Sequence, residues 1–142
     1  MEVDMATKQV SAKWTGEALN FVGVDTHGHQ IALGKDDTPP SQLVLIGLAG
    51  CTGMDVVSIL QKKRQKVTDV EVIVIGHQPD EYPKPFHKIQ VHYVVKGENL
   101  DPKAVERAIE LSESKYCVVS QTLQSDVEIK TSFRIEDTQA EG

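Results

Sequence analysis

The amino-acid sequence predicts an α+β protein with a mostly antiparallel sheet. Its strand-like and helix-like segments follow the order β-β-β-α-β-β-α-α-β, which lacks the regular alternation of parallel α/β folds. One long central segment is apolar on nearly every face, as in a helix that is buried on most sides. The 142 residues, 39% of them hydrophobic, suit a single domain over residues 1–142, with residues 1–7 and 136–142 as flexible ends.

The N-terminal part predicts three short strands joined by tight turns. The strand-like runs are Lys8–Trp14, Leu19–Asp25 and Gln30–Leu33. Turn-forming residues around Gly16 and Gly28 separate them. We therefore expect an antiparallel meander at this end of the chain.

The central segment Leu43–Leu60 predicts a helix. Two prolines stand just before it, as at many helix starts, and Thr38 or Asp37 is the expected N-cap. Asp55 is the single charged residue of the segment. This charge, three glycines and the lack of flanking aromatic residues argue against a membrane span, so we expect no membrane partner.

Glycines recur at every third position of this segment, at Gly47, Gly50 and Gly53. Each costs about 0.8–1 kcal/mol of helix propensity relative to alanine, so tertiary packing must offset the loss. Gly47, Gly50, Cys51 and Met54 share one helix face by the i, i+3, i+4 rule. We expect another backbone to approach this strip closely, beside Cys51.

The second half of the chain predicts two long strands, two helices and a last strand. In order, these are Val67–Gly76, Phe86–Lys96, a helix that Asp101 caps and Pro102 begins, Val118–Gln124, and Val127–Ile135. The proline-rich connection His77–Pro85 is expected to be an exposed loop. Val105, Ala108, Ile109 and Ser112 form the expected inner stripe of the first of these helices.

The charge balance and the N-terminal residues limit the class of partner and the compartment. A net charge of −6 and a pI near 5.3 disfavour binding to nucleic acid. The N-terminal residues lack the pattern of a secretory signal, so we expect a cytoplasmic protein. In that reducing compartment, a cysteine is a buried apolar residue, a redox thiol or a metal ligand.

Cys51 and Cys117 lie far apart in the sequence, so only the fold could bring them together. Cys51, in the middle of an apolar helix, is by itself compatible with an inert core thiol. Cys117 stands in or just before the first turn of a helix, where a thiolate is stabilised. The residues alone leave both interpretations open.

These cysteines and their neighbours resemble the two-cysteine signature of the OsmC/Ohr family of thiol-dependent peroxidases. The resembling motifs are the segment Pro40–Val57, with Gly-Cys-Thr-Gly around Cys51, and Lys-Tyr-Cys-Val around Cys117. The Asp-Val-Val-Ser-Ile-Leu run after Cys51 is most similar to the YhfA-like branch of the family. The resemblance extends from Trp14 to Phe133.

The resemblance implies a fold, an assembly and a chemistry. It implies an intertwined homodimer in which a mostly antiparallel sheet wraps two long central helices, with the thiol sites at the subunit interface. It implies that Cys51 is the peroxidatic and Cys117 the resolving cysteine. The implied partners are a small organic hydroperoxide and a dithiol reductant, with no cofactor and no metal.

The sequence departs from the family pattern at two positions. Active members hold the thiolate with an arginine on the N-terminal strands, and a glutamate before the first cysteine holds that arginine. Ser41 stands at the glutamate position, and no arginine precedes Arg64. Lys13 is the nearest cation, and Glu17 stands about where the arginine is expected. A lysine supplies a positive charge but lacks the bidentate fork with which an arginine orients a peroxide oxygen. The alternative function is therefore a non-peroxidase dimer that binds a small ligand or thiol compound.

The histidines and Asp55 are weaker candidates for a functional site than the two cysteines. His27 and His29 lie close in sequence, but the five histidines lack the paired spacing of a zinc motif. Asp55 follows Cys51 by one helical turn and, as a charge on a buried face, requires a partner. We interpret it as a structural residue.

Overall fold

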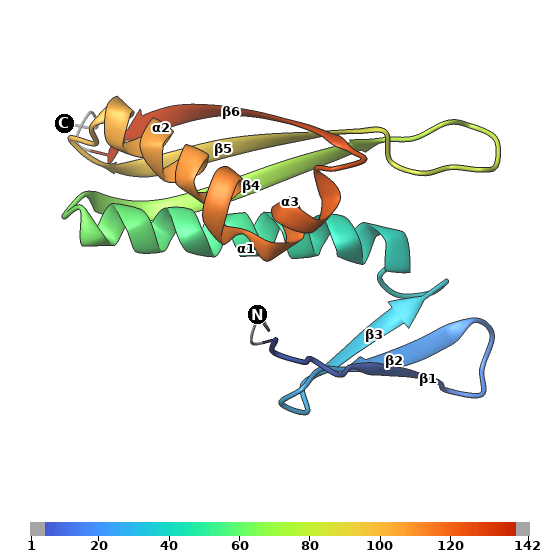
Figure 1. Cartoon of the computed structure of the whole chain (residues 1–142). Helices are drawn as coiled ribbons and strands as arrows, with labels where there is room; N and C mark the ends of the chain where they lie inside the picture. The colour runs from blue at the N-terminus through green and yellow to red at the C-terminus, as the bar shows by residue number, and fades with distance from the viewer. Residues whose placement is uncertain (1–4, 139–142) are drawn as a thin grey trace. The chain divides into compact units, whose positions relative to one another are not determined.

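The computed structural model describes residues 5–138, which form two compact units divided after Val44 (Figure 1). The N-terminal unit contains strands β1 (Ser11–Trp14), β2 (Asn20–Val24) and β3 (Gln30–Gly34). Helix α1 (Pro40–Lys62) begins in this unit and continues into the C-terminal unit. The element order agrees with the sequence prediction, and the α+β class is confirmed. The prediction of a single domain over residues 1–142 stays a prediction.

The N-terminal sheet is the expected meander, with β2 antiparallel to both β1 and β3. Gly34 ends β3 with a φ of +132°, and a Cβ there would lie 2.3 Å from the carbonyl oxygen of Leu19. Only glycine fits that position. In the turn after β2, the carboxylate of Asp25 accepts hydrogen bonds from the backbone N–H groups of His27 (2.8 Å) and His29 (3.0 Å).

The expected cap of α1 is wrong. The helix begins at Pro40, and the carbonyl of Pro39 accepts the first hydrogen bonds, from the N–H groups of Gln42 and Leu43. The position before the helix is therefore held by a proline, which has no side-chain acceptor. Thr38 instead uses its carbonyl to accept the N–H of Gly34, which joins the end of β3 to the helix start.

The C-terminal unit contains a second sheet in the order β4-β5-β6, formed by β4 (Lys66–His77), β5 (Lys88–Glu98) and β6 (Glu128–Asp137). β4 and β5 are antiparallel, whereas β5 and β6 are parallel. A parallel pair needs a crossover, and the helices between β5 and β6 supply it. This sheet is thus mixed, but three of the four strand pairings in the two sheets are antiparallel, in agreement with the expected mostly antiparallel arrangement.

The ends of the chain were predicted in part. Residues 136 and 137, expected to begin a flexible tail, belong to β6, where they pair with Lys96 and Gly97. Residues 1–4 and 139–142, also expected to be flexible, lie outside the described residues.

One face of the second sheet packs against helices, and the core lies between these two layers. The crossover consists of α2 (Pro102–Leu111), the π-helical turn η1 (Ser112–Tyr116) and α3 (Val118–Leu123). Asp101 caps α2 as predicted, accepting the N–H of Lys103 at 3.0 Å. Alternate residues of β5 join the inward faces of α1 and α2 in one cluster that includes Leu48, Val56, Tyr93, Val105 and Ala108.

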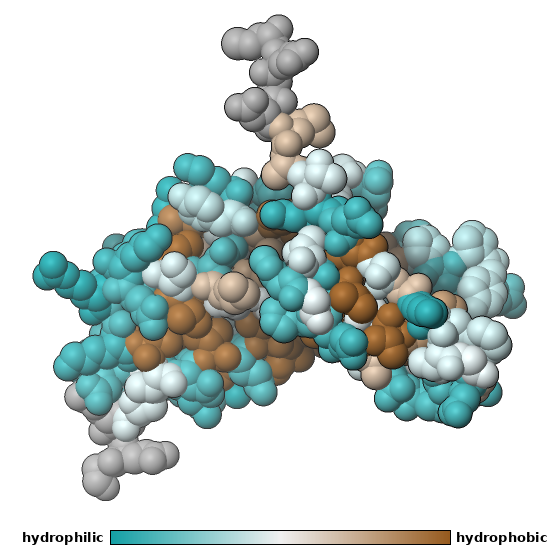
Figure 2. All heavy atoms as spheres, turned by 90° about the horizontal axis from the view of Figure 1, so that it is seen from below, coloured by the Kyte–Doolittle hydropathy of each residue, from teal (hydrophilic) through white to brown (hydrophobic). Residues whose placement is uncertain are grey.

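The opposite face of α1 is apolar and exposed. Met54 is 75% exposed and Ile46 55%, and a Cβ on Gly47 or Gly50 would meet no atom within 4 Å. Apolar surface is visible when the molecule is viewed from below (Figure 2). By length and composition alone, α1 is long and apolar enough to cross a membrane. Only 22% of its most apolar 18-residue stretch is buried. Within the described chain, the glycine strip is therefore open, and no neighbouring backbone occupies it.

Candidate functional site

Two thiols and a carboxylate meet between α1 and the start of α3. Cys51 and Asp55 lie one turn apart on α1, and Cys117 is the N-cap of α3. Their two Sγ atoms and a carboxylate oxygen of Asp55 all lie within 4.8 Å of one another. Both cysteines are free thiols. The fold thus brings together the two cysteines that the sequence singled out, and it adds Asp55 to them.

The π-helical turn places Cys117. After α2 the chain widens for one turn, and the N–H of Cys117 donates to the carbonyl of Ser112 at 2.7 Å. Single π-helical turns occur frequently at functional sites because they redirect side chains out of the regular helical pattern. Here the turn lets Ser112 and Cys117 both contact the α1 layer.

Cys117 is fully buried, and this raises its pKa to about 11. Loss of hydration disfavours the thiolate most, and the neighbouring Cys51 thiol acts in the same direction. The N–H of Ser120, which donates to Sγ at 3.4 Å, acts in the opposite direction and is weaker. At neutral pH Cys117 is therefore a protonated thiol.

A chain of buried hydroxyl groups orients Asp55. The Oγ of Ser112 donates to Asp55 Oδ2 at 2.9 Å, Thr52 Oγ1 lies 2.8 Å from Ser112 Oγ, and Tyr93 Oη lies 2.6 Å from Thr52 Oγ1. Because a carboxylate only accepts, Ser112 uses its hydrogen on Asp55, so Thr52 must donate to Ser112 and Tyr93 to Thr52.

All the hydroxyl donors in this chain therefore point toward the carboxylate. Burial raises the pKa of Tyr93 to about 12, so its hydroxyl stays a donor. The network thus runs in one direction, from Tyr93 through Thr52 and Ser112 to the carboxylate of Asp55, which lies beside the two thiols.

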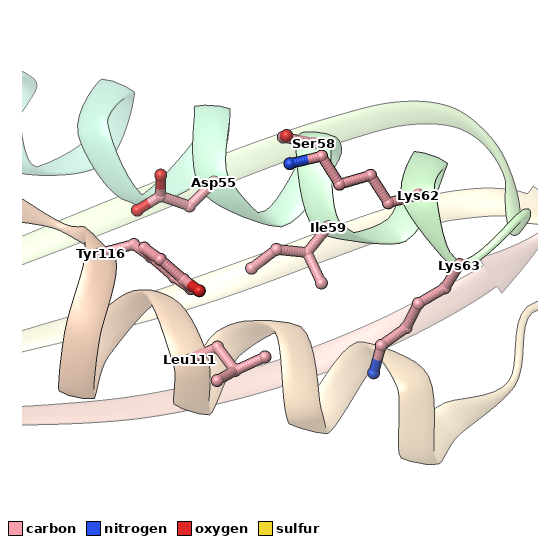
Figure 3. Close-up of a pocket in the computed structure, with 7 residues that line it drawn as sticks. All are labelled: Asp55, Ser58, Ile59, Lys62, Lys63, Leu111 and Tyr116. Atoms are coloured by element: carbon pink, nitrogen blue, oxygen red, sulfur yellow. The ribbon is translucent and has the colours of Figure 1, made fainter.

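A pocket of about 400 Å³ opens beside the cluster (Figure 3). Asp55 belongs to both the pocket and the thiol cluster. Ile59, Leu111 and the ring of Tyr116 form apolar walls, and Lys62 and Lys63 line the pocket near the end of α1. This volume suits a small organic molecule.

The other residues considered from the sequence lie elsewhere. Lys13 is exposed on β1, and Glu17 is exposed in the turn before β2, both within the N-terminal unit. Ser41 is exposed in the first turn of α1. His29 Nδ1 lies 2.8 Å from Asp25 Oδ2, and this interaction lowers the pKa of Asp25 to about 2.

Sequence reasoning gave no role to Thr52 or Tyr93, and it placed Ser112 only on the expected inner stripe of a helix. A signal was present, because a hydroxyl on an otherwise apolar inner stripe must find a partner. Those partners come from three separate elements, so the sequence could not name them. Asp55 does have the partner that its burial required, namely Ser112.

The fold and the site together define a protein that holds a pair of free cysteines, one half-buried and one buried, close to a small pocket. The model of the OsmC-like protein family matches residues 33–132, and this chain belongs to that family. It is 40% identical over 131 residues to Protein YhfA of Escherichia coli K12, a match that covers 89% of this chain and 97% of YhfA. The resemblance predicted from the two cysteine motifs is confirmed.

Solved structures show the same fold. A hypothetical protein from Aquifex aeolicus VF5 has a TM-score of 0.86 and 31% identity, with 94% of this chain and 98% of that one covered. The organic hydroperoxide resistance protein OhrB of Bacillus subtilis has a TM-score of 0.60 and 20% identity, with 91% and 98% covered. The expected OsmC-like fold is therefore confirmed.

Proposed function

We propose that this protein reduces small organic hydroperoxides, with Cys51 as the peroxidatic and Cys117 as the resolving cysteine. The observation that carries the proposal is the meeting of two free thiols within 4.8 Å, beside a pocket. Cys51 is partly exposed, whereas Cys117 is buried. This difference suits a first thiol that meets the substrate and a second that meets only the oxidised first one.

Asp55 supplies the base in this proposal. It takes the proton of Cys51 as the sulfur attacks the outer oxygen of the hydroperoxide. The O–O bond breaks, Cys51 becomes a sulfenic acid, and the departing alkoxide takes the proton back from Asp55 and leaves as an alcohol. In active family members an arginine stabilises the thiolate before the substrate arrives. Here the carboxylate of Asp55, within 4.8 Å of the Cys51 sulfur, would instead remove the proton during the attack.

Cys117 completes the cycle. Its sulfur attacks the sulfenic sulfur of Cys51, the S–S bond forms, and the hydroxyl leaves as water with the proton of Cys117. A dithiol reductant then returns two electrons and two protons and restores both thiols. Because burial keeps Cys117 protonated until this step, we expect resolution to be slower than in proteins with an ionised second thiol.

The proposed assembly is a homodimer in a reducing compartment such as the cytoplasm. The exposed face of α1 and strand β4 border an apolar groove of about 650 Å³, lined by residues that include Gly50, Gly53, Met54 and Val72. Apolar surface of this kind is characteristic of interfaces. A second copy of the chain, with its own glycine strip, is the occupant that the family resemblance implies.

The test is hydroperoxide consumption by the reduced protein with a dithiol reductant. Wild type should consume tert-butyl hydroperoxide catalytically, Cys51→Ser should lose all activity, and Asp55→Asn should turn over at least tenfold more slowly, as for loss of a general base. Asp69→Asn, which changes an exposed carboxylate on β4, is the matched control and should behave as wild type. Equal rates for wild type and Cys51→Ser would refute the proposal.

The second candidate function is binding of a small ligand or thiol compound without peroxide reduction. The substitution of Ser41 for the family glutamate, together with the lack of an arginine before Arg64, favours it. Under this hypothesis the protein stays inactive toward hydroperoxides, while a small thiol such as glutathione binds in the pocket and is detected by calorimetry. Replacement of Leu111 by a larger aromatic residue would then weaken binding without affecting the thiols.

A further inference from the structure

We propose that the reduced site also binds a thiophilic divalent cation, with Cys51, Asp55 and Cys117 as its ligands and Zn²⁺ as the representative ion. Cysteine, histidine, aspartate and glutamate side chains can all bind metal ions. Among the described residues, these three have donor atoms close enough to share one ion. Two come from one face of α1 and the third from the N-cap of α3. A cation-binding role is separate from peroxide reduction.

The geometry fits zinc with little movement. The donor atoms lie within 4.8 Å of one another, and ligands of a tetrahedral zinc with Zn–S bonds of about 2.3 Å stand roughly 3.8 Å apart. Cys51 and Asp55 have the i, i+4 spacing that lets two side chains of one helix hold the same ion. Three protein ligands leave a fourth position, and Asp55 also lines the adjoining pocket, from which a water or small ligand could fill it.

The hydrogen bonds around the site are those of a supported metal ligand. Ligating carboxylates are commonly held by a second group, and here Ser112 holds Asp55 while Thr52 and Tyr93 hold Ser112 in turn. Ser112, Thr52 and Tyr93 are all at least 98% buried, so their arrangement is set by packing. The backbone N–H of Ser120 points at the sulfur of Cys117, as donors do toward bound thiolates.

The charge of the cluster also points to a cation. All three groups are acids, and Asp55 forms no ion pair within residues 5–138. Lys62 and Lys63 line the same pocket as Asp55, but neither lysine forms an ion pair with its carboxylate. A divalent ion would balance the carboxylate and allow the sulfurs to bind as thiolates.

The donor types select the ion. Thiolate sulfur favours Zn²⁺ and related soft ions over Mg²⁺ and Ca²⁺, which prefer sites of oxygen alone. A bound ion would occupy both thiols, so the metal-bound and peroxide-reactive forms are alternative states of one reduced site. Oxidation of the cysteines to a disulfide would remove two of the three ligands.

The test is titration of the reduced, metal-free protein with Co²⁺ and Zn²⁺ without oxygen. We expect one Co²⁺ per chain with a sulfur-to-cobalt charge-transfer band that Zn²⁺ displaces and Mg²⁺ does not. Cys51→Ser or Cys117→Ser should abolish that band, and Ser112→Ala should weaken zinc binding by about 10–100-fold through loss of the support for Asp55. Asp69→Asn is the matched control and should bind as wild type.

Two further arms separate this proposal from its alternatives. Replacing both His27 and His29 by alanine should leave the binding unchanged, since these histidines are the competing zinc ligands of the N-terminal unit. A titration without the charge-transfer band, or binding that survives both cysteine variants, would overturn the inference. Because the titration uses no peroxide, a protein that binds zinc but reduces no hydroperoxide would refute the proposed enzyme activity alone, and the reverse result would refute the metal site alone.

Discussion

Replacement of Ser112 by alanine tests whether the buried hydroxyl chain holds Asp55. Ser112 is fully buried, donates to Asp55 at 2.9 Å and lies 2.8 Å from Thr52. A hydrogen bond to a charged group is worth about 1.5–3 kcal/mol and a neutral one about 0.5–1.5 kcal/mol. Asp55 is half-buried, so water recovers part of the first bond, whereas Thr52 is buried and loses its acceptor.

We therefore expect Ser112→Ala to lower the free energy of unfolding by about 2–3 kcal/mol, which corresponds to a fall in Tm of roughly 7–10 °C for a chain of this length. Denaturant unfolding followed by circular dichroism, at one fixed protein concentration, measures the change. Ser114→Ala, at an exposed serine two residues further along the same π-helical turn, should change it by less than about 0.5 kcal/mol.

A double-mutant cycle between Ser112→Ala and Asp55→Asn isolates the interaction itself. We expect a coupling energy of about 1 kcal/mol or more, as for residues in one hydrogen-bond network. A Ser112→Ala protein as stable as the Ser114→Ala control, or additive effects in the cycle, would show that the chain does not hold the carboxylate.

Alkaline titration, assembly and oxidation provide three further predictions. The folded protein keeps the proton of Cys117 to a pKa of about 11, against a usual value of 9.0, so between these pH values it binds more protons than the unfolded chain. The free energy of unfolding should therefore fall as pH rises through this window, and Cys117→Ala should flatten the slope; an unchanged slope would contradict the assignment. Met54→Glu, but not the control Met54→Leu, should disrupt the proposed dimer in sedimentation, because Met54 stands on the exposed apolar face of α1; a folded wild-type monomer at micromolar concentration would contradict the dimer. Mild peroxide should convert wild type to a Cys51–Cys117 disulfide, whereas Cys117→Ser should stop at a sulfenic acid on Cys51, as judged by mass spectrometry; independent oxidation of the two thiols would favour the ligand-binding alternative.

The sequence alone determined the elements and the two cysteines. Periodicity and turn residues are local properties, so they identified each strand and helix to within a few residues, including the Asp101 cap of α2. The two cysteine motifs were sufficient for the family, because their residues and spacing are specific. The cap of α1 was wrong because a helix start at Pro40 leaves the preceding position to another proline.

Only the tertiary structure decided how the site is assembled. The parallel pairing of β5 with β6 follows from the crossover, and the π-helical turn before Cys117 has no local signature that periodicity detects. The hydroxyl chain joins α1, β5 and η1, whose residues lie far apart in sequence. Asp55 could be recognised from the sequence as a buried charge in need of a partner, but its place beside both thiols depends on packing between separate elements, which no local pattern encodes.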